Sequence, residues 1–279
     1  MLVIQDAWVT NLEAAKLVLI LRLLWSLMRR KRSQSWLDPS RHSRECNYNL
    51  RHRRFSETFP RVIAMHSAAA LLDAKLRRGQ RPSSLDQNCI SAWANGSNKL
   101  SLLRKHGLSR DKVCIEVGCG NLRVGRHAIQ FLDADRYIGF DICPRILLEA
   151  KALAQASPYA SKRPRLLVWT TANRRAVPPA DFLFLFEVLM HVSPEMLRGF
   201  ITEITSIVSC HAIVVLNILL SDASIKFGTM SWIHAESNFL ENLRENGVEP
   251  SIASRRSISI RSIDGESYWA TKTLFVCSL

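Results

Sequence analysis

The chain has 279 residues, of which 47% are hydrophobic, and it carries a formal net charge of +14. This length and apolar content are sufficient for one large domain with an appendage. The seven cysteines form no C-x-x-C pair and have no metal-ligand spacing with the eight histidines. The pattern therefore predicts no metal site and is typical of free thiols in a reducing compartment.

The positive charge is concentrated in the N-terminal part of the chain. Residues 1–110 hold 20 Lys and Arg against 7 Asp and Glu, whereas residues 111–279 hold 18 against 17. The densest stretch runs from Arg29 to Arg54 and also contains proline, serine and asparagine. Such a segment is either a solvated basic linker or a contact for an anionic surface, which could be phospholipid headgroups or nucleic acid.

An apolar run at residues 14–28 precedes this basic stretch. It is 15 residues long and is interrupted by Lys16 and Arg22, so it is too short and too charged for a spanning helix. Its basic residues follow the apolar run, whereas a cleaved signal peptide has them in front. The run predicts an amphipathic helix that lies in a membrane interface, packs on the following domain, or precedes the true start codon.

Residues 55–110 have a helical pattern, with apolar residues such as Val62, Met65 and Ala69 on one face. Arg81 and Pro82 break this pattern, and a second helix is expected from about Ser91 to His106, with Gly107 as its C-cap. We therefore divide the chain into a basic segment at 1–54, a helical region at 55–110 and a domain at 111–279.

The most informative motif of the chain lies at residues 113–125. The apolar run VCIEV ends in the turn Gly118-Cys119-Gly120, and a helical pattern follows. A second apolar run, YIGF, ends in Asp141. Glycines at a strand end let a ligand approach the backbone N–H groups of a helix start, and an acid at the next strand end can bind two ribose hydroxyls. This arrangement predicts a site for an adenosine-containing cofactor.

The spacing of the motif discriminates among such cofactors. The dinucleotide pattern G-x-G-x-x-G would need a third glycine where this chain has Arg123, and no Gly-Lys-Ser/Thr of a P-loop follows. Glu116 stands two residues before the first glycine, where a carboxylate would repel a pyrophosphate but attract a sulfonium or an ammonium.

The rest of the 111–279 region alternates apolar runs with helical patterns. Runs such as FLFLF and AIVVL are apolar nearly throughout, which is typical of parallel strands covered on both faces. Ser193 is the expected N-cap of a helix with Pro194 at its first position. At the C-terminus two runs with period two, at 257–263 and 267–276, flank a predicted turn at Asp264-Gly265.

On these residues the chain resembles the class I S-adenosylmethionine-dependent methyltransferases over about residues 95–279. Their first motif is matched by Glu116, Gly118 and Gly120, and their second by Asp141. Their fourth-strand segment is matched by Asp181–Glu187 and the residues VLMHVSPE after it. Many members have a third glycine where this chain has Leu122. The resemblance implies a Rossmann-like α/β fold with helices on both faces of a mostly parallel seven-stranded sheet. It also implies a C-terminal antiparallel hairpin and a helical N-terminal region over the substrate pocket.

The resemblance also implies S-adenosylmethionine as cofactor and a set of residues around it. The loop Gly118–Gly120 holds the methionine end, Asp141 the ribose, and Glu116 the methionine ammonium through water or, alternatively, the loop N–H groups. Ile142 belongs to the same set, and Asn173 is a candidate for the adenine edge because the segment Thr170–Asn173 has no acid.

Glu187 and His191 are expected at the reactive end of the cofactor. Methyl transfer mainly needs the nucleophile, the methyl carbon and the sulfur in line, and His191 has a suitable pKa where the acceptor must lose a proton. Each residue has a structural alternative, Glu187 as a helix-start acid and His191 as a partner of a loop carbonyl. Arg123 and Arg126 either contact an acidic acceptor or lie on the surface of a helix. Trp232 and His234 either line the acceptor pocket or pack in the core.

The sequence therefore predicts a methyltransferase with a small-molecule acceptor, cytoplasmic or peripheral to a membrane. No Asn-Pro-Pro-Tyr motif and no Pro-Cys nucleophile are present. An RNA, lipid or glycan acceptor recruited by the basic N-terminal region is one alternative. A degenerate module that binds the cofactor without catalysis is another.

Overall fold

The computed structural model describes residues 87–227, 231–261 and 267–279. The amphipathic helix expected at 14–28, the basic stretch up to Arg54 and the first part of the helical region lie outside these residues, as does the turn at Asp264-Gly265. No helix in the described part is long and apolar enough to cross a membrane.

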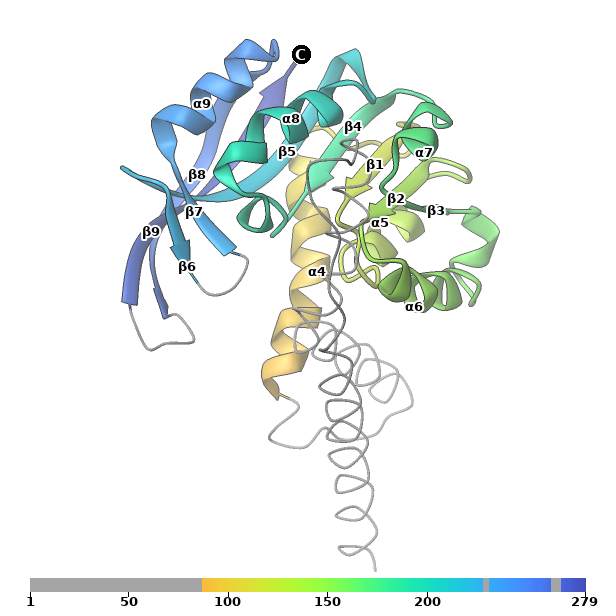
Figure 1. Cartoon of the computed structure of the whole chain (residues 1–279). Helices are drawn as coiled ribbons and strands as arrows, with labels where there is room; N and C mark the ends of the chain where they lie inside the picture. Colours follow the sequence, from red (N-terminus) through yellow and green to blue (C-terminus); the bar gives the residue numbers. More distant parts are fainter. Residues whose placement is uncertain (1–86, 228–230, 262–266) are drawn as a thin grey trace, which may run out of the picture. The chain divides into compact units, whose positions relative to one another are not determined.

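Helices and strands alternate along the domain as far as residue 221, as the apolar runs predict, and beyond it two pairs of strands flank one helix (Figure 1). The strands are β1 (Cys114–Val117), β2 (Tyr137–Asp141), β3 (Arg165–Val168), β4 (Ala180–Leu185), β5 (Val208–Ser221), β6 (Ile225–Phe227), β7 (Ser231–Ala235), β8 (Glu249–Arg261) and β9 (Ser267–Ser278). The α-helices are α4 (Gln87–Lys105), α5 (Gly125–Phe131), α6 (Pro144–Ala154), α7 (Thr171–Arg175), α8 (Pro194–Thr205) and α9 (Glu236–Glu245), and short 3-10 turns form η3 (Ala160–Lys162) and η4 (Leu189–His191).

The described residues form a sheet of nine strands, seven of which have the order β3-β2-β1-β4-β5-β9-β8, while β7 and β6 join it at β5. Strands β1 to β5 are parallel, and β9 runs antiparallel to β5 and β8. The order reverses between β1 and β4, so their carboxyl ends open a crevice of the kind in which open α/β sheets bind ligands.

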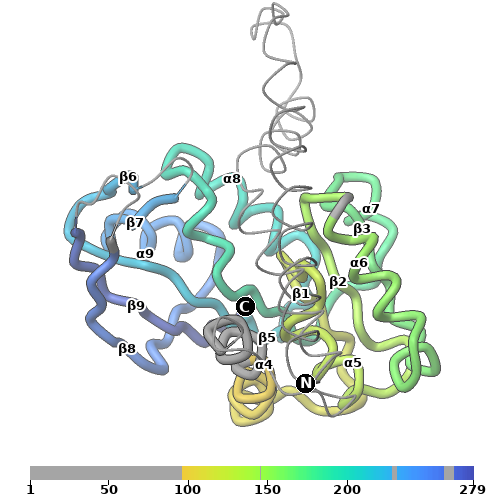
Figure 2. The backbone as a smooth tube through the Cα atoms, turned by 90° about the horizontal axis from the view of Figure 1, so that it is seen from below, coloured from red at the N-terminus to blue at the C-terminus, as the bar shows by residue number. Residues whose placement is uncertain are grey.

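Helices cover both faces of this sheet (Figure 2), and the strand β4 shows why. Its Leu183 and Leu185 pack in one apolar layer with α8 and α9, whereas its Phe182 and Phe184 pack in the other layer with α4, α5 and α6. Successive side chains of a strand point to opposite faces, so a strand that is apolar throughout must be covered on both sides.

The helix α4 confirms the predicted helical element before the first strand. Gly107 follows it with φ +98°, the left-handed conformation of a C-cap glycine. A Cβ at Gly96, within α4, would overlap the carbonyl oxygen of Arg123. The glycine thus lets α4 cross directly over the segment that follows the glycine loop.

Two features differ from the sequence-based expectation. The hairpin β6–β7 was not predicted, and its strand β7 pairs in parallel with the far end of β5 at Leu220 and Ser221. The C-terminal hairpin is longer than its alternating pattern, because β8 begins at Glu249 rather than at 257. The hairpin β6–β7 adds backbone at the carboxyl end of β5, whereas the added part of β8 pairs with Lys272–Ser278 of β9 and reaches toward the amino end of β5. Ser193 is the N-cap of α8 as expected, although its side chain makes no capping hydrogen bond.

Candidate functional site

The loop between β1 and α5 has the tight geometry that its glycines predict. Gly118 and Gly120 have φ values of +74° and +53°, which side chains other than glycine rarely adopt. A Cβ at Gly118 would in addition overlap the side chain of Val188, which follows β4. The two strand ends at the crevice can therefore approach each other only because residue 118 is glycine.

Asp141, at the end of β2, fixes this loop from the side. Its Oδ2 accepts a hydrogen bond from the Gly120 N–H at 2.8 Å, and its Oδ1 accepts one from the Cys143 N–H at 2.8 Å. Burial raises the pKa of Asp141 to about 6, although the backbone N–H groups oppose this shift. Each carboxylate oxygen has a second lone pair, so Asp141 can still accept bonds from the hydroxyls of a ligand.

Leu122 occupies the position at which the resembled family often has a third glycine. It is fully buried, yet its φ is +68°. A leucine in this left-handed conformation is strained, by about 1–2 kcal/mol. The loop thus keeps the backbone path of a glycine at this position and gains a buried apolar side chain.

Glu116 lies beneath the first turn of α5 and is 5% exposed. The Tyr137 hydroxyl donates a hydrogen bond to its Oε2, and a Cβ at Gly125 would come within 2.6 Å of the same oxygen. Burial raises the pKa of Glu116 to about 8, against the opposing effect of the tyrosine hydrogen bond. At neutral pH this carboxyl is therefore mostly protonated, and its partner is a phenol of β2.

The other residues predicted at the cofactor flank this loop. Cys119 is buried in it, and burial raises the pKa of its thiol well above the usual value. Ile142 is half-buried directly after Asp141. Asn173 lies in α7, where its Nδ2 donates a hydrogen bond to the Val168 carbonyl at 2.8 Å. One amide N–H of Asn173 is thus already engaged.

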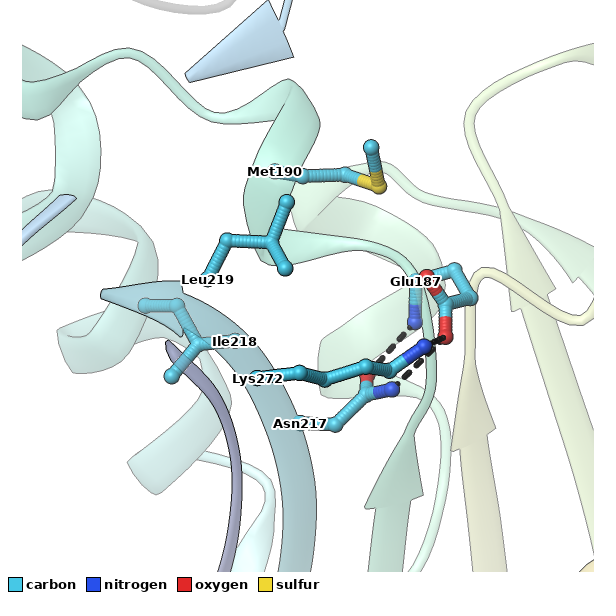
Figure 3. Close-up of a pocket in the computed structure, with 6 residues that line it drawn as sticks. All are labelled: Glu187, Met190, Asn217, Ile218, Leu219 and Lys272. Atoms are coloured by element: carbon cyan, nitrogen blue, oxygen red, sulfur yellow. Dashed lines mark hydrogen bonds and ion pairs between the residues drawn. The ribbon is translucent and has the colours of Figure 1, made fainter. Parts of the chain in front are cut away.

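Glu187, just after β4, forms a cluster with two residues that the sequence reasoning missed (Figure 3). Asn217 of β5 accepts a hydrogen bond from the Glu187 N–H through Oδ1 and donates one to Glu187 Oε1 through Nδ2, each at 2.7 Å. Lys272 of β9 lies 2.6 Å from the same Oε1. Glu187 has a φ of +60°, so the clamp by Asn217 holds it in an unfavourable backbone conformation.

These contacts decide the ionisation of Glu187. Burial favours the neutral acid, but the Lys272 ammonium and the Asn217 amide outweigh it and keep the pKa of Glu187 below its usual value. The carboxylate therefore stays charged at neutral pH. It lines a small pocket whose other walls are Met190, Asn217, Ile218, Leu219 and Lys272.

The remaining candidates lie outside this pocket. His191, in η4, is half-buried and does not line it. His234 is 1% exposed, with its Nε2 3.0 Å from the Leu189 carbonyl oxygen, and burial lowers its pKa. It is therefore a core residue that supports η4.

Trp232 is half-buried, with the Lys226 ammonium 5.7 Å from its ring centre. Arg126 is buried and Arg123 half-buried, both within or beside α5.

A signal for one of the missed residues is present in the sequence. Asn217 is the only polar residue in the run AIVVLNILL, and a buried polar side chain within a covered strand needs a partner. Lys272 gives no such signal, because a lysine in an alternating strand is ordinarily solvated.

In the described residues no group of His, Cys, Asp and Glu could hold a metal ion. The cysteines there whose side chains are described are free thiols.

The sheet order, the glycine loop and the terminal antiparallel strands together define the class I methyltransferase fold. The chain is similar to magnesium protoporphyrin IX methyltransferase (ChlM) from Synechocystis PCC 6803 with bound SAM. The TM-score is 0.57 and the identity 16%, over 88% of this chain and 100% of the other. YcgJ from Bacillus subtilis matches with a TM-score of 0.51 and 11% identity, over 65% and 97%. No family model matches the sequence, and no curated protein matches it either.

Proposed function

We propose that the chain is an S-adenosylmethionine-dependent methyltransferase that acts on a small molecule. The observation that carries this proposal is the hydrogen bond from the Gly120 N–H to Asp141, beside the point between β1 and β4 where the order of the sheet reverses. This bond holds a glycine loop and a carboxylate side by side at adjacent strand ends. The carboxylate can bind the ribose of an adenosine ligand, and the glycines let the ligand come close to the backbone.

The residues of the loop fit this cofactor. The loop Gly118–Gly120 would hold the methionine end through the close backbone approach that its glycines allow, and the free lone pairs of Asp141 would accept from the ribose hydroxyls. Ile142 would pack on the nucleoside and Asn173 would present its remaining amide atoms to the adenine edge. Glu116, with Tyr137, would support the loop from below and keep Cys119 and its neighbours in place. When bound, the cofactor supplies a methyl group that is already activated on a sulfonium.

The remaining work of the chain is to orient the acceptor and to manage any proton it loses. Glu187 is held as a carboxylate by Asn217 and Lys272, so it would orient the acceptor rather than take up a proton. His191 is the candidate general base where the acceptor must lose a proton. An RNA, lipid or glycan acceptor would depend on the basic segment at residues 14–54, which lies outside the described residues.

Calorimetric titration of the full chain with S-adenosylhomocysteine tests this proposal, with NADH as a parallel control. We expect micromolar binding of S-adenosylhomocysteine alone. Labelled donor then allows a screen of small-molecule acceptors. Binding of NADH in place of S-adenosylhomocysteine, or of neither, would overturn the assignment.

A further inference from the structure

The pocket at Glu187 is lined by one carboxylate and one ammonium, that of Lys272, and a second ammonium lies near it. The Lys272 ammonium lies 2.6 Å from the carboxylate. The Lys99 ammonium, which comes from α4, lies 4.5 Å from the ring centre of Phe186, the residue just before Glu187. Two ammonium groups from distant parts of the chain thus lie near a single carboxylate, one in contact with it and one over the ring of the preceding residue.

The electrostatic coupling of these groups agrees with the geometry. Burial lowers the pKa of Lys99, and the charge of Lys272 lowers it further. The charge of Glu187 raises the pKa of Lys99, and the charge of Arg123 lowers it. The ammonium groups of Lys272 and Lys99 therefore share the field of one carboxylate, which cannot neutralise both. A partly buried ammonium without a full counter-charge is costly, and an anion bound nearby would offset that cost.

The other side of the pocket is apolar. Leu219 is 5% exposed and belongs to an apolar cluster with Phe227 of β6, Ile233 of β7 and Ala270 of β9, against which Met190 packs. The unpredicted hairpin and the long C-terminal hairpin thus supply this wall. In Figure 3 Met190 and Leu219 lie on one side of the pocket, while Lys272 and Asn217 point to Glu187 on the other.

We propose that the methyl acceptor carries an anionic group, a carboxylate or a phosphate, which binds between Lys272 and Lys99, with its apolar part against Met190 and Leu219. This inference rests on the proposed function, because it names the substrate class of that same site. Lys272 and Lys99 are its specificity-determining residues. Glu187, which Asn217 holds in turn, keeps the Lys272 ammonium in place, and the remaining N–H donors of Lys272 serve the acceptor.

A cationic acceptor is the competing possibility, since Glu187 is itself a carboxylate. An amine bound there would have to displace Lys272 and would meet the repulsion of Lys99. The two possibilities predict opposite effects of the same substitution, because Lys272→Gln removes the attraction for an anion but relieves the repulsion of an amine.

The test uses four ligands that share an aromatic ring, namely phenylacetate, phenyl phosphate, phenylacetamide and phenethylamine. Their binding to the full chain is measured by saturation-transfer NMR and calorimetry, with and without S-adenosylhomocysteine. The variants are Lys272→Gln and Lys99→Gln, and the control is Lys151→Gln on the exposed face of α6. Comparison of phenylacetate with phenyl phosphate distinguishes the two sources of the anion.

We expect at least one anion to bind in preference to the amide and the amine. Lys272→Gln and Lys99→Gln should each weaken its binding roughly tenfold or more, whereas Lys151→Gln should not. Preference for the amine or the amide, equal binding of the anion to the lysine variants, or no binding of either anion would overturn this inference. If S-adenosylhomocysteine binds in these cases, the proposed function still stands. If anions bind and S-adenosylhomocysteine does not, the proposed function fails by itself.

Discussion

The Asp141 carboxylate holds the Gly120 N–H at 2.8 Å, so the end of β2 fixes the path of the loop after β1. Asp141→Ala should therefore remove two kinds of hydrogen bond, the one that fixes the loop and those expected from the ribose hydroxyls. We expect the affinity for S-adenosylhomocysteine to fall by about 1–3 kcal/mol. Calorimetric titration of the variant measures this loss.

Asp141→Asn separates the two effects. The amide can keep one acceptor oxygen for the loop, but its nitrogen cannot accept a second bond, so we expect an intermediate affinity. Asp133→Ala, an exposed acid paired with Arg110 after α5, is the matched control. Unchanged affinity in Asp141→Ala would show that the ribose does not bind there.

The contact between Gly118 and Val188 predicts a repairable clash. Gly118→Ala introduces a methyl group that overlaps Val188, at a φ of +74°. We expect a loss of about 2–4 kcal/mol in the free energy of unfolding, from the overlap and the backbone strain together. Urea denaturation of both single variants and the double variant measures it.

Val188→Ala removes the methyl groups that cause the overlap, so the double variant should recover part of the loss. We expect a coupling energy of about 1 kcal/mol or more. Simple additivity of the two single changes would mean that the strand ends at the crevice do not approach each other as described.

Leu122 provides a comparison of glycine with alanine at a strained position. Leu132 is the control, because it is equally buried but has an ordinary φ of −69°. There a change to alanine should lower the free energy of unfolding less than a change to glycine. At Leu122, with its φ of +68°, the glycine variant should be at least as stable as the alanine variant, because only glycine adopts this conformation freely. Four denaturation curves test this reversal. The same order of stability at both positions would contradict it.

Much of the fold could be predicted because its signals are local. The glycine turn, the acid at Asp141 and the apolar runs each lie within a few neighbouring residues, and the structure has the corresponding strands and helices close to the expected bounds. The conformations of Gly118 and Gly120 follow from the same local reasoning. The strained φ of Leu122 does not, because leucine at this position gives no sign of it.

The acceptor end could be predicted only in part, because its contacts are not local. Glu187 and Lys272 are 85 residues apart and meet through the pairing of Leu219 with Lys272 between β5 and β9. A shift of one residue in that register would turn Lys272 to the other face of the sheet. No pattern in the sequence fixes this register. The hairpin β6–β7 was missed because its strands are short and have few alternating residues.

The buried pair of Glu116 and Tyr137 predicts a dependence of stability on pH. The pKa of Glu116 is raised from 4.5 to about 8 in the folded chain, so between these values the folded chain keeps a proton that the unfolded chain has lost. This group therefore stabilises the fold at low pH, and its contribution is lost as the pH rises through about 8. The free energy of unfolding changes with pH, through this one group, by at most about 1.4 kcal/mol per pH unit.

Glu116→Gln keeps an acceptor for the Tyr137 hydroxyl and cannot ionise, so its stability relative to the native chain should increase steadily from about pH 5 to about pH 8. Denaturation curves across this range measure the difference, and the same change at the exposed Glu249 should give none of this trend. A constant difference between Glu116→Gln and the native chain over that range would mean that Glu116 is ionised in the fold.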